Sequence, residues 1–241
     1  MIDKNFDWGA FDRNKLLLSC LKEEFEGHIN YEKFFPVEEN DIVVDIGASV
    51  GPFPKSILNK NLKEVICLEP HPILFKTLYK NLSDYKNVKC LNKGISLVDG
   101  EILFENLFDD TKDPNYTGNE LWRKKEKCSS ITFKTLIKKY NLEKIDFLKI
   151  DCEGGEYDVF IPDNFYWIQN NVRKIAGEWH LHTEEFKEKF IMFRDFYLKK
   201  FNEFKIFFVD RQSNFFDITG EVWDNNFIYK YGWFNIYIDN R

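Results

Sequence analysis

The stretch IVVDIGASVG, residues 42–51, decides the fold. Its β-branched first half is typical of a buried strand, because such side chains pack well on a pleated surface. Two glycines then permit a tight turn in which the backbone comes close to a ligand. A helix is expected over 52–61, so the stretch predicts a strand–turn–helix unit.

Strand and helix alternate along the rest of the chain. Apolar runs predict further strands at 65–68, 88–91, 146–150 and 174–178. Helices are predicted at 73–85, 133–140 and 184–201. Two late aromatic runs predict strands that pair antiparallel at an edge, at 204–209 and 234–238, and shorter peripheral strands are expected at 101–104 and 130–133. We therefore expect an α/β fold with a Rossmann-like, doubly wound, mostly parallel sheet of seven strands, an antiparallel edge strand and helices on both faces.

The length of 241 residues suits one domain with a modest extension. An amphipathic helix is expected over 13–26, so residues 1–40 are predicted to form a helical extension packed on the core, and residues 41–241 the main domain. No apolar run approaches the roughly 18 residues that span a bilayer, and residues 1–5 lack a secretory signal pattern, so no membrane partner is expected. The cysteines are scattered and lack CxxC spacing, which predicts reduced thiols and a cytoplasmic protein.

The acid before the glycine turn narrows the ligand. The turn lacks the G-x-G-x-x-G pattern that cradles a pyrophosphate, and it lacks the Gly-Lys-Ser/Thr of a Walker loop. Asp45, two residues before Gly47, would repel a pyrophosphate but hold an α-amino group, directly or through water. S-adenosylmethionine (SAM) offers an ammonium group and no phosphate. A purely structural turn is the alternative, and the turn alone leaves both open.

A second acid lies at the end of the next predicted strand. Glu69 follows the glycine turn by about 20 residues, where a ribose diol lies in nucleoside-binding sheets. A carboxylate accepts hydrogen bonds from both ribose hydroxyls. The alternative is an exposed acid ahead of a helix, and the adjacent His71 is expected to be a cap or a loop residue. The two acids together favour a nucleoside cofactor.

On these residues the sequence resembles a class I SAM-dependent methyltransferase, and within that class the FkbM family. The family motif D-I-G-A-N-I-G matches residues 45–51, with Ser49 in place of the usual Asn. The distinctive stretch K-I-D-V-E-G-A-E matches residues 149–156, and an E-x-H pair matches residues 178–180. The resemblance covers roughly residues 40–180 and implies methylation of a hydroxyl on a small-molecule, sugar or glycan acceptor.

Methyl transfer from a sulfonium is an in-line displacement, so the protein mainly has to align the acceptor oxygen. A sugar hydroxyl is a poor nucleophile, and a base or a metal ion beside its proton would help. We expect SAM to contact residues at the strand ends, namely Asp45, Gly47, Ala48, Ser49, Gly51, Glu69 and Asp151. The predicted catalytic residues are Asp151, Glu153, Glu178 and His180.

Two pairs of polar residues are predicted to converge on one site. Asp151 and Glu153 follow the central strand, while Glu178 and His180 alternate on the next strand and therefore point the same way. His180 is the predicted base, because an ordinary histidine pKa of about 6.5 leaves the imidazole neutral at pH 7 and able to accept a proton. Asp151 is expected to orient the hydroxyl or the base. In a less favoured alternative Asp151, Glu178 and His180 bind a divalent ion that acidifies the hydroxyl, and we assign no metal ligand from the sequence.

Other features narrow the acceptor. The central strand is not followed by the Asn/Asp-Pro-Pro-Tyr/Phe of enzymes that methylate exocyclic amines of DNA bases, and Cys152 follows Asp rather than Pro, so it is expected to pack. Glu156 is expected to cap the following turn, and His182 to be a solvated loop residue. The net charge of −6 disfavours a protein that holds nucleic acid mainly by electrostatics, and no DNA partner is expected.

Two alternative functions and the role of one segment remain undecided from the sequence. An RNA 2′-hydroxyl methyltransferase is disfavoured by the acidic balance, and a non-catalytic SAM-fold module by the convergent acids. The segment 105–128 contains Phe108, Tyr116, Trp122 and a basic run at 123–125. It is interpreted either as a lid or acceptor platform, or as a solvated loop. The sequence leaves the acceptor's identity and the oligomeric state open.

Overall fold

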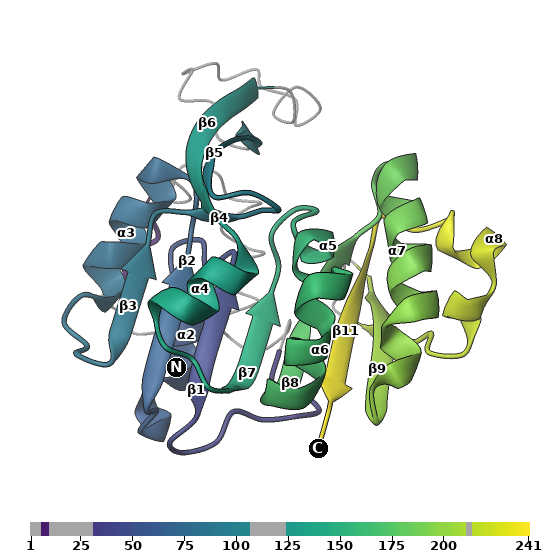
Figure 1. The fold of residues 1–241 in the computed structure, drawn as a ribbon, viewed down its shortest axis with the longest axis horizontal. Coiled ribbons are helices and arrows are strands. Elements are labelled where there is room, and N and C mark those ends of the chain that lie inside the picture. Colours follow the sequence, from purple (N-terminus) through teal and green to yellow (C-terminus); the bar gives the residue numbers. More distant parts are fainter. Residues whose placement is uncertain (1–5, 10–30, 107–123, 211–213) are drawn as a thin grey trace.

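The computed structural model describes residues 6–9, 31–106, 124–210 and 214–241. The strands of its central sheet are β1 (Ile42–Ile46), β2 (Glu64–Leu68), β3 (Val88–Leu91), β7 (Ile145–Ile150), β8 (Val172–His180), β9 (Glu203–Val209), β10 (Phe215–Asp217) and β11 (Trp233–Asp239). They lie in the order β10-β9-β11-β8-β7-β1-β2-β3 (Figure 1). The helices are α2 (Pro52–Ile57), α3 (Pro72–Leu82), α4 (Phe133–Lys139), α5 (Glu156–Val159), α6 (Pro162–Asn171), α7 (Glu184–Phe196) and α8 (Asn225–Ile228).

The strand order confirms the doubly wound α/β fold. Five neighbouring strands are parallel, from β3 through β2, β1 and β7 to β8. The chain runs outward from β1 to β2 and β3 and then returns to β7 on the other side of β1, so the strand order reverses between β1 and β7. Open α/β sheets bind ligands at the carboxyl ends of the strands beside such a reversal.

The antiparallel part of the sheet differs in detail from the expectation. β11 lies inside the sheet, antiparallel to both β8 and β9, and the short β10 is an additional eighth strand at the edge. Residues 234–238 of β11 are fully buried, as a strand flanked on both sides and covered on both faces requires. Two aromatic runs close together in sequence predicted their pairing correctly but not the order of the strands.

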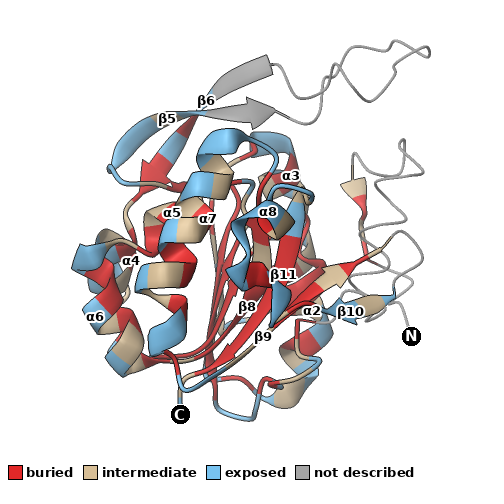
Figure 2. Cartoon of the chain, turned by 90° about the vertical axis from the view of Figure 1, so that its right-hand side faces the viewer, coloured by how far each residue is buried: buried red, intermediate tan, exposed pale blue. Residues whose placement is uncertain are grey.

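Apolar layers cover both faces of the sheet. On the first face, Val44 of β1 belongs to a core cluster with residues of α4, α5, α6 and α7. On the second face, Val43 belongs to a cluster with residues of α2 and α3. Figure 2 shows the strands buried between helices whose outer sides are exposed. Because side chains alternate along a strand, Asp45 lies on the same face as Val43.

The segment 31–40 packs on the second face. Tyr31 and Phe35 are buried there among side chains of α2 and the sheet. At the start of β8, the buried Nζ of Lys174 donates to the carbonyl oxygen of Pro36 (2.5 Å) and to Glu38 (3.0 Å). The helix predicted at 13–26 lies outside the described residues, so the helical extension stays a prediction.

A small second sheet lies beyond the edge where β7 ends (Figure 1). It consists of β4 (Gly94–Ile95), β6 (Lys124–Ile131) and β5 (Gly100–Asn106) in that order, and it contains both predicted peripheral strands. Phe108, Tyr116 and Trp122 lie outside the described residues, so the role of the segment 105–128 stays a prediction.

The remaining expectations concern the membrane and the cysteines. Within the described ranges, no helix combines the length and apolar character that crossing a membrane demands. Four cysteines are free thiols, namely Cys67, Cys90, Cys128 and Cys152, while Cys20 lies outside the described residues. Free thiols agree with reduced cysteines, and the cytoplasmic location stays a prediction.

Candidate active site

The glycine turn after β1 brings two strand ends into contact. Gly47 has a φ of +84°, and a Cβ at this position would lie 1.7 Å from the carbonyl oxygen of Asp151. The backbone N–H of Asp151 donates to the carbonyl oxygen of Ile46 (3.0 Å). Because only glycine permits this approach, Gly47 allows Asp151 to lie directly beside the turn.

Ser49 and His71 hold the carboxylate of Glu69 at the end of β2. The backbone N–H of Ser49 donates to Oε2 of Glu69, and that of His71 donates to Oε1, both at 2.8 Å. The ring of His71 caps α3 by accepting from the N–H of Ile73 (3.2 Å), as expected of a cap. Burial raises the pKa of Glu69 to about 8, although the two backbone N–H groups favour its ionised form. Glu69 is therefore anchored beside the turn rather than exposed.

The hydrogen-bonding capacity of the Glu69 carboxylate suits a ribose diol. A carboxylate offers about four lone-pair positions, and the two backbone N–H groups occupy two of them. The remaining two match the two hydroxyl donors of a ribose. Ser49 has a φ of +52°, a left-handed conformation in which Asn, the usual residue of the resembling motif, is more common than Ser.

Ala48 and Gly51 connect the turn to β2 and α3. The N–H of Ala48 donates to the carbonyl oxygen of Leu68 (2.9 Å). Gly51, with a φ of +91°, precedes α2, and a Cβ there would lie 2.9 Å from Cδ1 of Leu78. Gly51 is therefore needed for packing of the turn on α3, while its expected contact with SAM stays a prediction.

The observed partner of Asp45 is Lys149. The carboxylate of Asp45 is fully buried, and its Oδ1 lies 3.2 Å from Nζ of Lys149. Burial raises the pKa of Asp45, while the charge of Lys149 acts in the opposite direction. The same Nζ donates to the carbonyl oxygen of Gly47 (2.8 Å) and lies 3.9 Å from Oδ2 of Asp151. Lys149 thus joins the glycine turn to both acids, and the expected contact between Asp45 and the amino group of SAM stays a prediction.

The chain turns sharply after β7 around the carboxylate of Glu156. Glu153 and Gly154 have φ values of +58° and +106°. The N–H of Cys152 donates to Oε1 of Glu156 (2.9 Å), and the N–H of Gly154 donates to Oε2 (2.8 Å). Glu156 caps the turn as expected, and its Oε1 also lies 2.9 Å from Nδ1 of His180. The fully buried Glu156 therefore connects this turn to β8.

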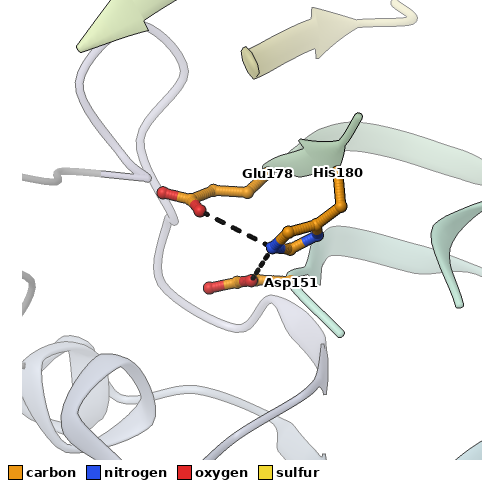
Figure 3. A group of neighbouring side chains, drawn as sticks. All are labelled: Asp151, Glu178 and His180. Atoms are coloured by element: carbon orange, nitrogen blue, oxygen red, sulfur yellow. Dashed lines mark ion pairs between the residues drawn. The ribbon is translucent and has the colours of Figure 1, made fainter. Parts of the chain in front are cut away.

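Asp151, Glu178 and His180 converge at the carboxyl ends of β7 and β8 (Figure 3). The Nε2 atom of His180 lies 3.8 Å from Oδ1 of Asp151 and 4.0 Å from Oε2 of Glu178. It also lies 3.4 Å from Oε2 of Glu153. The four predicted catalytic residues therefore lie together, and the side chain of His180 at their centre is only 7% exposed.

The charges of this cluster bear on the role expected of His180, which stays a prediction. Burial lowers the pKa of His180, but the carboxylates of Glu156, Glu153 and Asp151 outweigh it and raise the pKa well above its ordinary value. Burial, aided by Asp151, raises the pKa of Glu178 to about 8. A protonated imidazole does not accept a proton, so the cluster favours a carboxylate over His180 as the base.

Several residues of the site were not identified from the sequence. The hydroxyl of Tyr31 donates to Oδ2 of Asp151 (2.8 Å), and Nδ2 of Asn235 donates to Oε1 of Glu178 (3.4 Å). Both come from segments without a motif, and only the packing of 31–40 and the pairing of β11 with β8 bring them here. Lys149 and Glu156 lie inside the matching motif. The motif marks these two positions as important, but it does not show which side chains they contact.

Two further expectations concern neighbours of the cluster. His182 is exposed, as expected, and its ring packs against that of His180 with the centroids 5.3 Å apart. Cys152 packs against the first-face core, and burial raises the pKa of its thiol well above the usual value. Neither observation assigns a chemical role to these side chains.

Comparison with known proteins gives three findings. The model of the methyltransferase FkbM domain matches residues 45–208. A search of curated proteins found no significant match. A putative rRNA methylase from Clostridium thermocellum is 12% identical, with a TM-score of 0.49 over 89% of this chain and 95% of that one. A putative methyltransferase from Streptococcus mutans, solved with S-adenosylhomocysteine (SAH), is 10% identical, with a TM-score of 0.47 over 84% and 90% of the two chains.

A doubly wound sheet with a glycine turn at its reversal point and an anchored acid on the next strand defines a nucleoside-binding α/β protein. The family model spans more than half of the chain, and the chain therefore belongs to the FkbM methyltransferase family. It is a SAM-dependent methyltransferase, as the sequence predicted.

Proposed function

We propose that this protein transfers the methyl group of SAM to a hydroxyl oxygen of a small-molecule or sugar-like acceptor. The observation that carries the proposal is the cluster of Asp151, Glu178 and His180 beside the glycine turn (Figure 3). When bound, SAM supplies a methyl group already activated by its sulfonium. The protein therefore has to align the acceptor oxygen and remove its proton. Removal of the proton matters most for a hydroxyl acceptor, because a hydroxyl is a poor nucleophile.

The proposal assigns the two ends of the cofactor to two sets of residues. Glu69 would hold the ribose, since its carboxylate is fixed by two backbone N–H groups and keeps acceptor capacity. The turn at Gly47 lies between Glu69 and Asp151, so the sulfonium end would face the cluster.

Glu178 is the proposed base. In its ionised form, which prevails above a pH of about 8, Glu178 is a stronger proton acceptor than an ordinary carboxylate. As the carbon–sulfur bond breaks and the carbon–oxygen bond forms, the hydroxyl proton passes to Glu178 and SAH leaves. Asp151 would accept a hydrogen bond from the acceptor, and the charged His180 would keep the neighbouring carboxylates in place.

Deuterated SAM tests the chemistry. The full-length protein is incubated with it and with a panel of methyl glycosides and polyols, and products are examined by mass spectrometry and NMR. We expect a methoxy group on one acceptor class. A methyl group found on nitrogen, sulfur or carbon would contradict the proposal, and 2′-O-methylated RNA would favour the RNA alternative instead.

Glu178→Gln tests the proposed base. The isosteric change should lower kcat by about 100-fold or more, because general base catalysis contributes that much, and should leave the affinity for SAH unchanged. Glu188→Gln, an exposed acid of α7, is the matched control and should behave as the wild type. Equal kcat values for the two variants would remove Glu178 from the mechanism.

A further inference from the structure

One imidazole nitrogen is aimed into a group of acidic side chains. Glu156 lies 2.9 Å from Nδ1 of His180, and a carboxylate accepts a hydrogen bond there, so the free position Nε2 points the other way. Carboxylate oxygens of Asp151, Glu153 and Glu178 lie within 4.0 Å of Nε2. The side chain of His180 is only 7% exposed, so a buried ligand atom faces the cluster.

Negative charge exceeds positive charge around this nitrogen. Four carboxylates surround His180, namely those of Asp151, Glu153, Glu156 and Glu178. Lys149 lies 3.9 Å from Asp151, and it is closer to the fully buried Asp45, at 3.2 Å. A divalent cation would balance the excess, since buried charges are stable when they are paired or bind a metal.

The spacing of the three inner ligand atoms suits such a cation. One atom each from Asp151, Glu178 and His180 lies within 4.8 Å of the other two. Neighbouring ligands of a metal with bonds of about 2.1 Å lie about 3 to 3.5 Å apart. The widest of these separations therefore has to shrink by up to about 1.3 to 1.8 Å, which rotations at the ends of two carboxylate side chains provide.

We propose that Asp151, Glu178 and His180 bind a divalent cation of the Mn²⁺ type. Two carboxylates with one imidazole are an oxygen–nitrogen set that suits Mn²⁺ and related transition metals better than Mg²⁺, which prefers oxygen alone. Glu156 and Asn235 are positioning residues, because one holds His180 and the other holds Glu178. A metal-binding histidine usually donates its second N–H to such a carboxylate.

The catalytic consequence rests on the proposed methyl transfer to a hydroxyl, whereas the cation site itself does not. With the cation bound, Glu178 is a ligand, and the cation acidifies the acceptor hydroxyl in its place. Glu153, with 45% of its side chain exposed, is then the carboxylate that takes up the hydroxyl proton.

Titration with Mn²⁺ tests the site in the full-length protein after treatment with a chelator. Calorimetry should show one Mn²⁺ per chain, and pulsed electron paramagnetic resonance should show coupling to an imidazole nitrogen. Asp151→Asn and Glu178→Gln should each weaken the affinity at least about tenfold, while Glu188→Gln should not change it. Both variants are isosteric, and circular dichroism checks that they fold.

Three results would overturn the cation site: absence of Mn²⁺ binding, binding that both variants leave unchanged, or absence of nitrogen coupling in the wild type. Its failure is distinguishable from that of the proposed function. Binding of SAH and formation of a methoxy product without Mn²⁺ would remove only the catalytic role of the cation. Mn²⁺ bound with the expected variant effects, but a methyl group transferred to nitrogen, would remove only the hydroxyl acceptor.

Discussion

At the scale of single residues, the site depends on positions where a larger side chain would clash with its neighbours. Gly47 is the clearest case, because its hydrogen lies where a Cβ would meet the carbonyl oxygen of Asp151 at 1.7 Å. The sequence indicated the tight turn here, since glycines after a buried strand are typical of ligand-binding turns. It did not indicate which other segment the turn touches.

Gly47→Ala should destabilise the protein by about 3 kcal/mol or more, because the strand ends have to separate and the φ of +84° becomes strained. Urea unfolding followed by circular dichroism measures the loss. Gly220→Ala is the control, since a Cβ there meets nothing within 4 Å, and it should change the stability by less than about 0.5 kcal/mol. Similar stabilities of the two variants would show that the close contact is not present.

Glu69 links affinity to pH. Burial raises its pKa to about 8, and only the ionised carboxylate accepts strongly from two ribose hydroxyls. Because binding favours the deprotonated form, the affinity for SAH should be lower at pH 7 and rise as the pH passes through about 8. Calorimetry across this pH range measures the change in affinity. Glu69→Gln is the control for the protonation of SAH itself. A wild-type profile as flat as that of Glu69→Gln would contradict the assignment.

At the scale of elements, two neighbouring strands are joined by a buried ion pair. Asp45 at the end of β1 and Lys149 of β7 lie 3.2 Å apart, almost without exposure. The sequence predicted a contact between Asp45 and SAM from the place of this acid two residues before Gly47, but it did not show how deeply the side chain is buried. Only the register of β1 on β7 places the lysine directly beside the acid.

Lys149→Met should destabilise the protein by about 3 to 5 kcal/mol, because it leaves the carboxylate of Asp45 buried without its partner. The double variant Asp45→Asn, Lys149→Met removes both charges and should be more stable than Lys149→Met alone. Urea unfolding of the set forms a double-mutant cycle. Lys127→Met, which breaks an exposed pair with Glu101, should cost less than about 1 kcal/mol. Strict additivity in the cycle would disprove the coupling.

At the scale of the whole molecule, the sequence predicted most of the architecture and part of the site. Periodicity and motif order identified the parallel strands and the two acids at the strand ends, because these are local patterns. The interior position of β11 and the contacts of Tyr31 and Asn235 depend on which distant segments meet. The raised pKa of His180 could not be predicted from the sequence either, since it depends on three carboxylates from one turn.

The central claim is that SAM lies across the carboxyl ends of β2, β1 and β7 with its methyl group facing Asp151, Glu178 and His180. A crystal structure of the SAH complex measures this most directly. We predict the ribose hydroxyls on the carboxylate of Glu69 and the sulfur atom directed at the cluster. SAH bound elsewhere, or with its sulfur turned away from these three side chains, would contradict the account.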